Sequence, residues 1–122
     1  MKLIRSFGYA FNGLVQALGQ TNLRILFFIA FAVIGAGFYY NIARLEWVIL
    51  IMTIGFVISM ELINTSIENL TDLVTKEQNP LAGKVKDIAA AAVLFASFIA
   101  LILGLIILAK YIFPNGVLMP NT

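Results

Sequence analysis

Hydrophobic residues fill three long runs of the chain, and two short polar stretches separate them. The first run contains no charged residue, the second turns polar after Glu61, and the third is uncharged from Ile88 to Ala109. At about 1.5 Å per helical residue, each run is long enough to cross a hydrocarbon core of roughly 30 Å. The pattern predicts three membrane-spanning helices, over residues 25–43, 47–74 and 82–112.

The first 19 residues follow a different pattern. Their large apolar side chains recur at helical spacing and alternate with polar ones: Leu3, Ile4, Phe7, Phe11, Leu14, Val15 and Leu18 against Lys2, Arg5, Asn12 and Gln16. A helix with one apolar and one polar face is typical of segments that lie in the plane of the membrane interface. We therefore predict an amphipathic interfacial helix over residues 1–19.

A row of polar side chains begins inside the second apolar run. Its members are Glu61, Asn64, Glu68 and Asp72. Because an α-helix turns about 100° per residue, these four side chains share a sector of roughly 80° on one face. Placing a carboxylate in a lipid-like environment costs several kcal/mol, so this acidic stripe requires a partner such as a cation or a reacting substrate.

Composition places the chain among membrane proteins. It has 122 residues, enough for one domain, of which 61% are hydrophobic and 11% charged, and its mean hydropathy is +0.99. These values lie outside the usual range of water-soluble domains. The N-terminus lacks the pattern of a removable signal peptide. We predict an all-α membrane protein with a single domain over residues 1–122.

The residue types that are missing restrict the chemistry. The chain has no cysteine and no histidine, so a metal ion would be bound by oxygen, which favours Mg²⁺ or a similar hard cation. No run of basic residues supports nucleic-acid binding. No glycine-rich phosphate loop occurs, so a nucleotide would depend on lysines and on a metal held by carboxylates.

The basic residues predict the orientation in the membrane. Six fall on one side of the predicted spans and two on the other: Lys2, Arg5, Arg24, Lys76, Lys84 and Lys86 against Arg44 and Lys110. By the positive-inside rule, the N-terminus and the second loop face the cytoplasm. Five of the six acidic residues lie between positions 61 and 87. Any chemistry is therefore expected at the cytoplasmic membrane boundary, where a soluble nucleotide could meet a lipid.

Burial distinguishes the two glutamates of the stripe. A desolvated carboxylate is a stronger proton acceptor, so Glu61 is a candidate general base. Glu68 lies nearer to water and could hold Mg²⁺ bridged to phosphate oxygens, with Asn64 between the two glutamates. Lys84 and Lys86 could gather phosphate or could simply face lipid headgroups. The stripe itself could instead join helices in an oligomer or conduct protons or cations.

A face of small residues follows the third span: Ala92, Ala96, Ala100 and Gly104. Small side chains allow helices to approach closely in lipid. We expect this face to pack against a neighbouring helix.

Two motifs resemble a known family. They read Glu61-Leu-Ile-Asn64-Thr-Ser-Ile-Glu68-x-x-x-Asp72 and Ala82-Gly-Lys-Val-Lys86-Asp87-Ile-Ala-Ala-Ala-Ala-Val93. This pattern resembles the prokaryotic integral-membrane diacylglycerol kinases, which include the undecaprenol kinases of Gram-positive bacteria. Residues 5–13 and the turn at 45–47 are similar as well, so the resemblance covers nearly the whole chain.

The resemblance implies a fold and an activity. It implies one interfacial helix and three transmembrane helices, assembled as a homotrimer with shared active sites in the bacterial inner membrane. It further implies transfer of the γ-phosphoryl group of Mg-ATP to the hydroxyl of diacylglycerol or undecaprenol at the cytoplasmic surface. The turn at 45–47 resembles the undecaprenol-type members somewhat more.

The resemblance also implies roles for individual residues. Glu61 matches the catalytic base, Asn64 an essential asparagine and Glu68 a metal ligand. The implied ATP contacts are Lys2, Tyr9, Glu77, Gln78, Asn79, Lys86 and Asp87. The implied contacts to the lipid substrate are Glu61, Asn12 and Ala90.

Three positions depart from the family pattern. Gln20 stands where a second metal-binding glutamate is usual, and a neutral amide binds Mg²⁺ more weakly. Asn79 replaces a loop histidine, and Lys2 replaces an arginine, which removes the bidentate guanidinium. These departures leave a catalytically weakened family member as an alternative, and a sharp gain of turnover in Gln20→Glu would support it.

Overall fold

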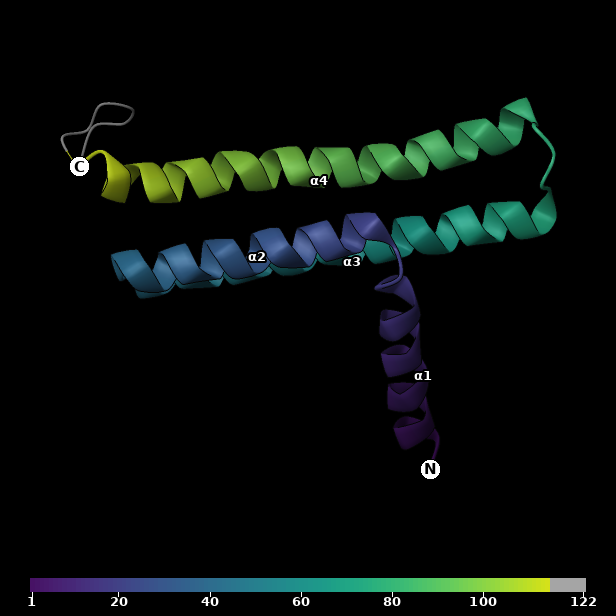
Figure 1. Cartoon of the computed structure of the whole chain (residues 1–122), viewed down its shortest axis with the longest axis horizontal. Helices are drawn as coiled ribbons and strands as arrows, with labels where there is room; N and C mark the ends of the chain where they lie inside the picture. Colours follow the sequence, from purple (N-terminus) through teal and green to yellow (C-terminus); the bar gives the residue numbers. More distant parts are fainter. Residues whose placement is uncertain (115–122) are drawn as a thin grey trace.

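The computed structural model describes residues 1–114 and contains four helices over that range. They are α1 (Lys2–Ala17), α2 (Thr21–Tyr40), α3 (Arg44–Val74) and α4 (Pro80–Ile112). The three long helices lie roughly along one direction, and α1 projects away from them near the middle of α3 (Figure 1). The all-α prediction is confirmed, with one short helix and three long ones.

Each long helix can cross a membrane by length and composition. The 20 residues of α2 extend about 30 Å, which matches the hydrocarbon core. The 31 residues of α3 and the 33 of α4 extend about 46 to 50 Å, so both exceed that thickness. Many large apolar side chains face outward on these helices, as lipid-facing side chains do. The chain is therefore a multi-pass membrane protein.

The helix bounds differ by a few residues from those predicted. The helix at the N-terminus spans 2–17 instead of 1–19. The prediction for the first span was wrong at its end: α2 runs from Thr21 to Tyr40, whereas 25–43 was expected. The next residue, Asn41, has a φ of 50°, in the left-handed region that terminates helices. Because an uncharged stretch continues past this turn, hydrophobicity alone does not mark the helix end.

A close approach supports this turn. An added Cβ on Gly37 would lie 2.7 Å from the Trp47 ring and 3.2 Å from Ile42. Since real Cβ atoms essentially never lie within 3.0 Å of another heavy atom, only glycine allows the Trp47 ring to lie this close to α2. The Trp47 ring also packs on Phe38, with the ring centroids 4.8 Å apart.

Polar contacts join α3 and α4 at both ends. At one end Glu46 accepts a hydrogen bond from the Tyr111 hydroxyl. At the other, Lys86 pairs with Asp72. These contacts are 26 positions apart on α3 and 25 on α4, so the two antiparallel helices keep almost constant register over about 38 Å. This register places Glu61 and the rest of the acidic stripe opposite the alanine-rich part of α4.

The small-residue face of α4 is used in two ways. Ala96 is buried, whereas Ala92 is exposed. Ala100 and Gly104 line an apolar hollow of about 420 Å³ that α2 and α3 also border. The predicted close packing is therefore seen at Ala96, whereas Ala100 and Gly104 border open space within this chain.

Candidate functional site

The acidic stripe lies on one face of α3 and passes from buried to exposed. Glu61 is 4% exposed and Asn64 is 6% exposed, whereas Glu68 is half-buried and Asp72 is exposed. Exposure of the side chains therefore increases along the stripe from Glu61 to Asp72, in the order that the sequence predicts.

Asn64 connects the two halves of the stripe. Its side-chain Nδ2 donates a hydrogen bond to Oε1 of Glu68, one helical turn away, at 3.0 Å. Its Oδ1 is buried and has no hydrogen-bond partner within residues 1–114. A buried acceptor without a donor is costly. Asn64 thus orients Glu68 and leaves an oxygen beside it for a hydroxyl or a cation.

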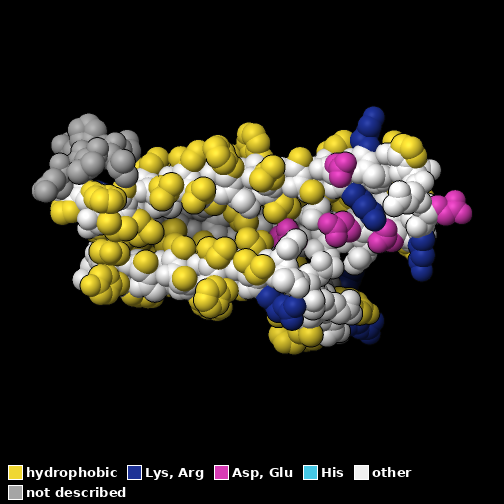
Figure 2. All heavy atoms as spheres, turned by 45° about the horizontal axis from the view of Figure 1, so that its top comes forward, with side chains coloured by type: hydrophobic (Ala, Val, Ile, Leu, Met, Phe, Trp, Pro, Cys, Tyr) yellow, Lys and Arg dark blue, Asp and Glu magenta, His cyan; other side chains and the backbone are white. Residues whose placement is uncertain are grey.

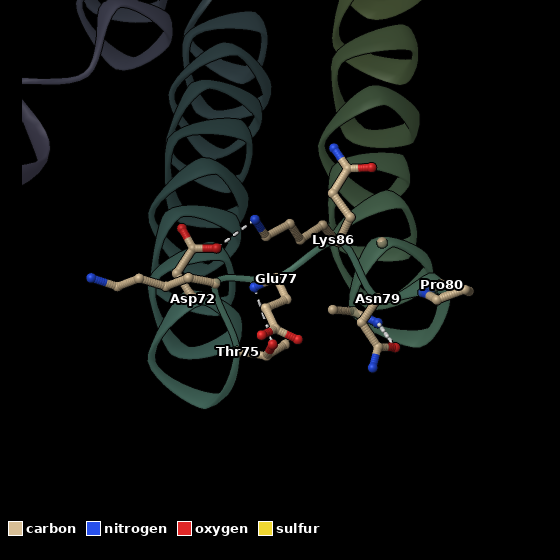
Figure 3. Close-up of a pocket in the computed structure, with 10 residues that line it drawn as sticks. Asp72, Thr75, Glu77, Asn79, Pro80 and Lys86 are labelled. Carbon is tan, nitrogen blue, oxygen red and sulfur yellow. Dashed lines mark hydrogen bonds and ion pairs between the residues drawn. The ribbon is translucent and has the colours of Figure 1, made fainter.

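The aqueous end of the stripe contacts α4. Lys86 Nζ lies 2.6 Å from Oδ1 of Asp72, and the two side chains are 39% and 52% exposed. Figure 3 shows this pair bridging the two helices above the loop that connects them. Among the residues that the resemblance assigns to ATP, Lys86 is the one that the structure joins directly to the stripe.

The loop between α3 and α4 and the adjoining helix ends line an open, polar hollow of about 510 Å³. Its lining contains two acidic and two basic side chains, namely Asp72, Glu77, Lys76 and Lys86. Gln78 and Asn79 line it as well, so all three predicted loop contacts border the same space. Small-molecule sites usually measure about 300 to 1,000 Å³, which the hollow matches.

Asn79 caps α4. Its Oδ1 accepts hydrogen bonds from the backbone N–H groups of Leu81, at 2.8 Å, and Ala82, at 3.4 Å, as Figure 3 shows in part. Pro80 then occupies the first helical turn, where its missing N–H carries no cost. The predicted third span begins at residue 82, whereas α4 begins at Pro80. The asparagine-proline pair is itself a recognisable helix start.

Several predicted site residues are exposed in this chain. Tyr9 is 73% exposed on α1, and Lys2, Asn12, Asp87 and Ala90 are exposed too. None of them lines the hollow at the loop. Their roles stay predictions.

Gln20 borders a different hollow. This space of about 430 Å³ lies between α1 and α3, and Thr65, Ser66 and Asn69 line it together with Gln20. No contact joins Gln20 to Glu68 in the part of the chain that the structure describes, so the predicted pairing of the two as metal ligands remains a prediction. Over residues 1–114, no three acidic side chains cluster closely enough to hold a metal ion by themselves.

On the face shown in Figure 2, most charged side chains gather toward one end of the long helices and on the part that projects from them, and apolar side chains cover most of the rest. The structure combines helices long enough to span a membrane with a carboxylate stripe that reaches a polar hollow. This combination is typical of a membrane protein with a site at the lipid–water boundary. The family model "Prokaryotic diacylglycerol kinase" matches residues 8–108. The chain belongs to this family of lipid kinases.

Individual relatives agree with the family model. The chain is 37% identical over 107 residues to the undecaprenol kinase of Bacillus subtilis, with 87% of each chain covered. It is 38% identical over 104 residues to a diacylglycerol kinase of Synechocystis, covering 84% of this chain and 59% of the relative. It is 32% identical over 95 residues to the diacylglycerol kinase of Haemophilus influenzae, covering 77% of this chain and 80% of the relative.

Proposed function

We propose that the protein is a Mg²⁺-dependent lipid kinase that transfers the γ-phosphoryl group of ATP to the hydroxyl of a membrane lipid. The observation that carries the proposal is the course of the acidic stripe. It starts at a buried glutamate among apolar helices and ends at the Asp72–Lys86 pair beside a polar hollow. Along this course, a lipid alcohol and a nucleotide would meet on the same helix face.

Glu61 is the proposed general base. In the transfer, the lipid oxygen forms a bond to the γ-phosphorus, the bond from that phosphorus to the β,γ-bridging oxygen of ATP breaks, and ADP leaves. The proton of the lipid hydroxyl passes to the Glu61 carboxylate. Burial of Glu61 supports this role, because a poorly hydrated carboxylate accepts a proton more readily than a hydrated one.

Glu68 and Asn64 are the proposed ligands of the metal ion. The buried, unpartnered Oδ1 of Asn64 and the half-buried carboxylate of Glu68 are oxygen donors of the kind that Mg²⁺ prefers. Two protein oxygens suffice when phosphate oxygens and waters complete the octahedron. Bound Mg²⁺ would neutralise charge that develops on the transferred phosphoryl group.

The polar hollow is the proposed nucleotide site. Lys86 would contact the phosphates, while Glu77 and Gln78 would contact the remainder of ATP. Asn79 contributes by fixing the start of α4, and Lys86 follows about two turns later on the same helix. Phosphoryl transfer depends chiefly on positioning and charge neutralisation, so this small set of side chains is chemically sufficient.

The lipid and the assembly belong to the same proposal. The similarity to the undecaprenol kinase of Bacillus subtilis over 87% of both chains favours undecaprenol over diacylglycerol as the preferred alcohol. The exposed Leu3, Phe7 and Phe11 support a position of α1 in the interface of the bacterial inner membrane. We propose a homotrimer with the active sites on the cytoplasmic side.

The test is a kinase assay in lipid with labelled ATP and each alcohol in parallel. Wild-type protein should label the lipid, and Glu61→Gln, which keeps the size of the side chain, should lower kcat by about 10² to 10⁴. Helical content and thermal stability of the variant should stay those of the wild type. Absence of labelled lipid with both alcohols, or full activity of Glu61→Gln, would refute the proposal.

A further inference from the structure

Asp72 has no part in the reaction as proposed so far, yet it is the stripe residue that contacts α4. Its Oδ1 lies 2.6 Å from Lys86 Nζ. No other carboxylate contacts Lys86 within residues 1–114. Figure 3 shows the two side chains extended toward each other across the space between their helices.

The Asp72–Lys86 ion pair contributes little to the stability of the fold. Both side chains are substantially exposed, at 39% and 52%, and ion pairs in water contribute little to folding. The pair does, however, restrict a lysine side chain, which otherwise samples many rotamers. Fixing a binding group in advance lowers the entropy lost when a ligand binds.

The Lys86 ammonium, although paired with Asp72, can still donate hydrogen bonds to a ligand. A lysine ammonium has three donors, and Asp72 uses one of them, so two remain for phosphate oxygens. Both residues line the polar hollow at the loop between α3 and α4, called the loop hollow below. Lys76 lines it as well, but no hydrogen bond or ion pair holds its ammonium in the range that the structure covers.

We propose that Asp72 is a positioning residue, which holds the Lys86 ammonium at the edge of the loop hollow so that a nucleotide polyphosphate meets it there. This inference rests on the proposed kinase function. For nucleotide affinity, it predicts a change opposite to the one that charge repulsion alone would give. Removing the Asp72 charge should weaken the binding of an anionic nucleotide, although one negative charge fewer would by itself strengthen it.

The experiment compares variants of the full chain in lipid. Asp72→Asn should raise KM for Mg-ATP about five- to tenfold with a smaller change in kcat, and Asp72→Glu should restore most of the affinity. Leu73→Lys is the matched control. It changes the net charge by the same amount at the next residue, on a side chain that is 81% exposed and turned away from the stripe. Its KM should equal that of the wild type or be lower.

A binding measurement makes the dependence on Lys86 explicit. The affinity of a non-hydrolysable ATP analogue with Mg²⁺ should fall in Asp72→Asn, and it should not fall further when Asp72→Asn is added to Lys86→Met. Equal or tighter binding by Asp72→Asn, or additive losses in the double variant, would overturn the inference. If wild-type protein phosphorylates neither alcohol, the proposed function fails instead, and the analogue titration still decides the relation between Asp72 and Lys86.

Discussion

At the scale of single residues, Asn64 is the side chain on which the geometry of the site depends most. It is buried, its amide nitrogen holds Glu68, and its oxygen is free of protein donors within residues 1–114. Glu61 and Glu68 are about two turns apart, and Asn64 lies between them on the same helix face.

Asn64→Leu should therefore weaken Mg²⁺ binding more than it disturbs folding. The change keeps a side chain of similar size but removes the hydrogen bond to a charged carboxylate, which is worth about 1.5 to 3 kcal/mol. We expect the Mg²⁺ concentration for half-maximal activity to rise about tenfold or more. The measurement is a Mg²⁺ titration at saturating ATP. Asn69→Leu, the same change at an exposed position of α3, should leave the titration unaltered, and an unaltered titration in Asn64→Leu would contradict this role.

Periodicity was sufficient to place Glu61, Asn64 and Glu68 on one face, because side-chain direction on a helix follows from residue number. It could not identify the partner of each side chain. The Asn64–Glu68 bond follows from i,i+4 spacing, but the Asp72–Lys86 pair joins residues on two helices. Spacing along one helix carries no information about which residue of another helix lies opposite.

At the scale of elements, a second polar cluster fixes the far ends of α3 and α4. Glu46 accepts hydrogen bonds from the backbone N–H of Ala43, at 2.9 Å, and from the Tyr111 hydroxyl, and it pairs with Lys110 at 3.0 Å. The Tyr111 hydroxyl also accepts the Ala43 N–H, at 3.2 Å. This cluster ties the turn between α2 and α3 to the last turn of α4.

Tyr111→Phe should destabilise the protein without altering nucleotide affinity. The change leaves the Glu46 carboxylate short of one donor, which costs about 1 to 3 kcal/mol. Thermal unfolding in detergent or lipid should show a lower Tm, while KM for Mg-ATP stays within about twofold, because the loop hollow is about 38 Å away. Tyr39→Phe is the control. Tyr39 is 79% exposed and its hydroxyl has no hydrogen-bond partner in the structure over residues 1–114, so its Tm should not change. An unchanged Tm in Tyr111→Phe would refute the structural role of the cluster.

The three spans could be predicted because apolar length is a strong signal, whereas the ends of the helices could not be placed so well. The end of α2 depends on the left-handed backbone of Asn41 and on the Trp47 ring against Gly37. The cluster around Glu46 depends on contacts across 65 residues of sequence. Neither kind of contact leaves a local pattern in the sequence.

At the scale of the whole molecule, the two ends of the bundle differ in character. One end carries the loop hollow, the exposed part of the stripe and most of the charged residues. The other carries the aromatic side chains of Tyr39, Tyr40 and Trp47 and the compact cluster around Glu46. Aromatic side chains concentrate at membrane–water interfaces, and basic residues concentrate on the cytoplasmic side. A kinase that uses cytoplasmic ATP requires the end with the loop hollow to face the cytoplasm.

The absence of cysteine from the sequence allows a direct test of this orientation. Single cysteines can be introduced at Leu45, which is 70% exposed near the aromatic end, and at Val74, which is 78% exposed near the loop hollow. A membrane-impermeant maleimide added to spheroplasts should label Leu45→Cys at once, and it should label Val74→Cys only after the membrane is opened. The wild-type chain, which has no thiol, measures the background. The reverse labelling pattern would place the loop hollow outside the cell, away from ATP, and would exclude the proposed reaction however well the stripe is formed.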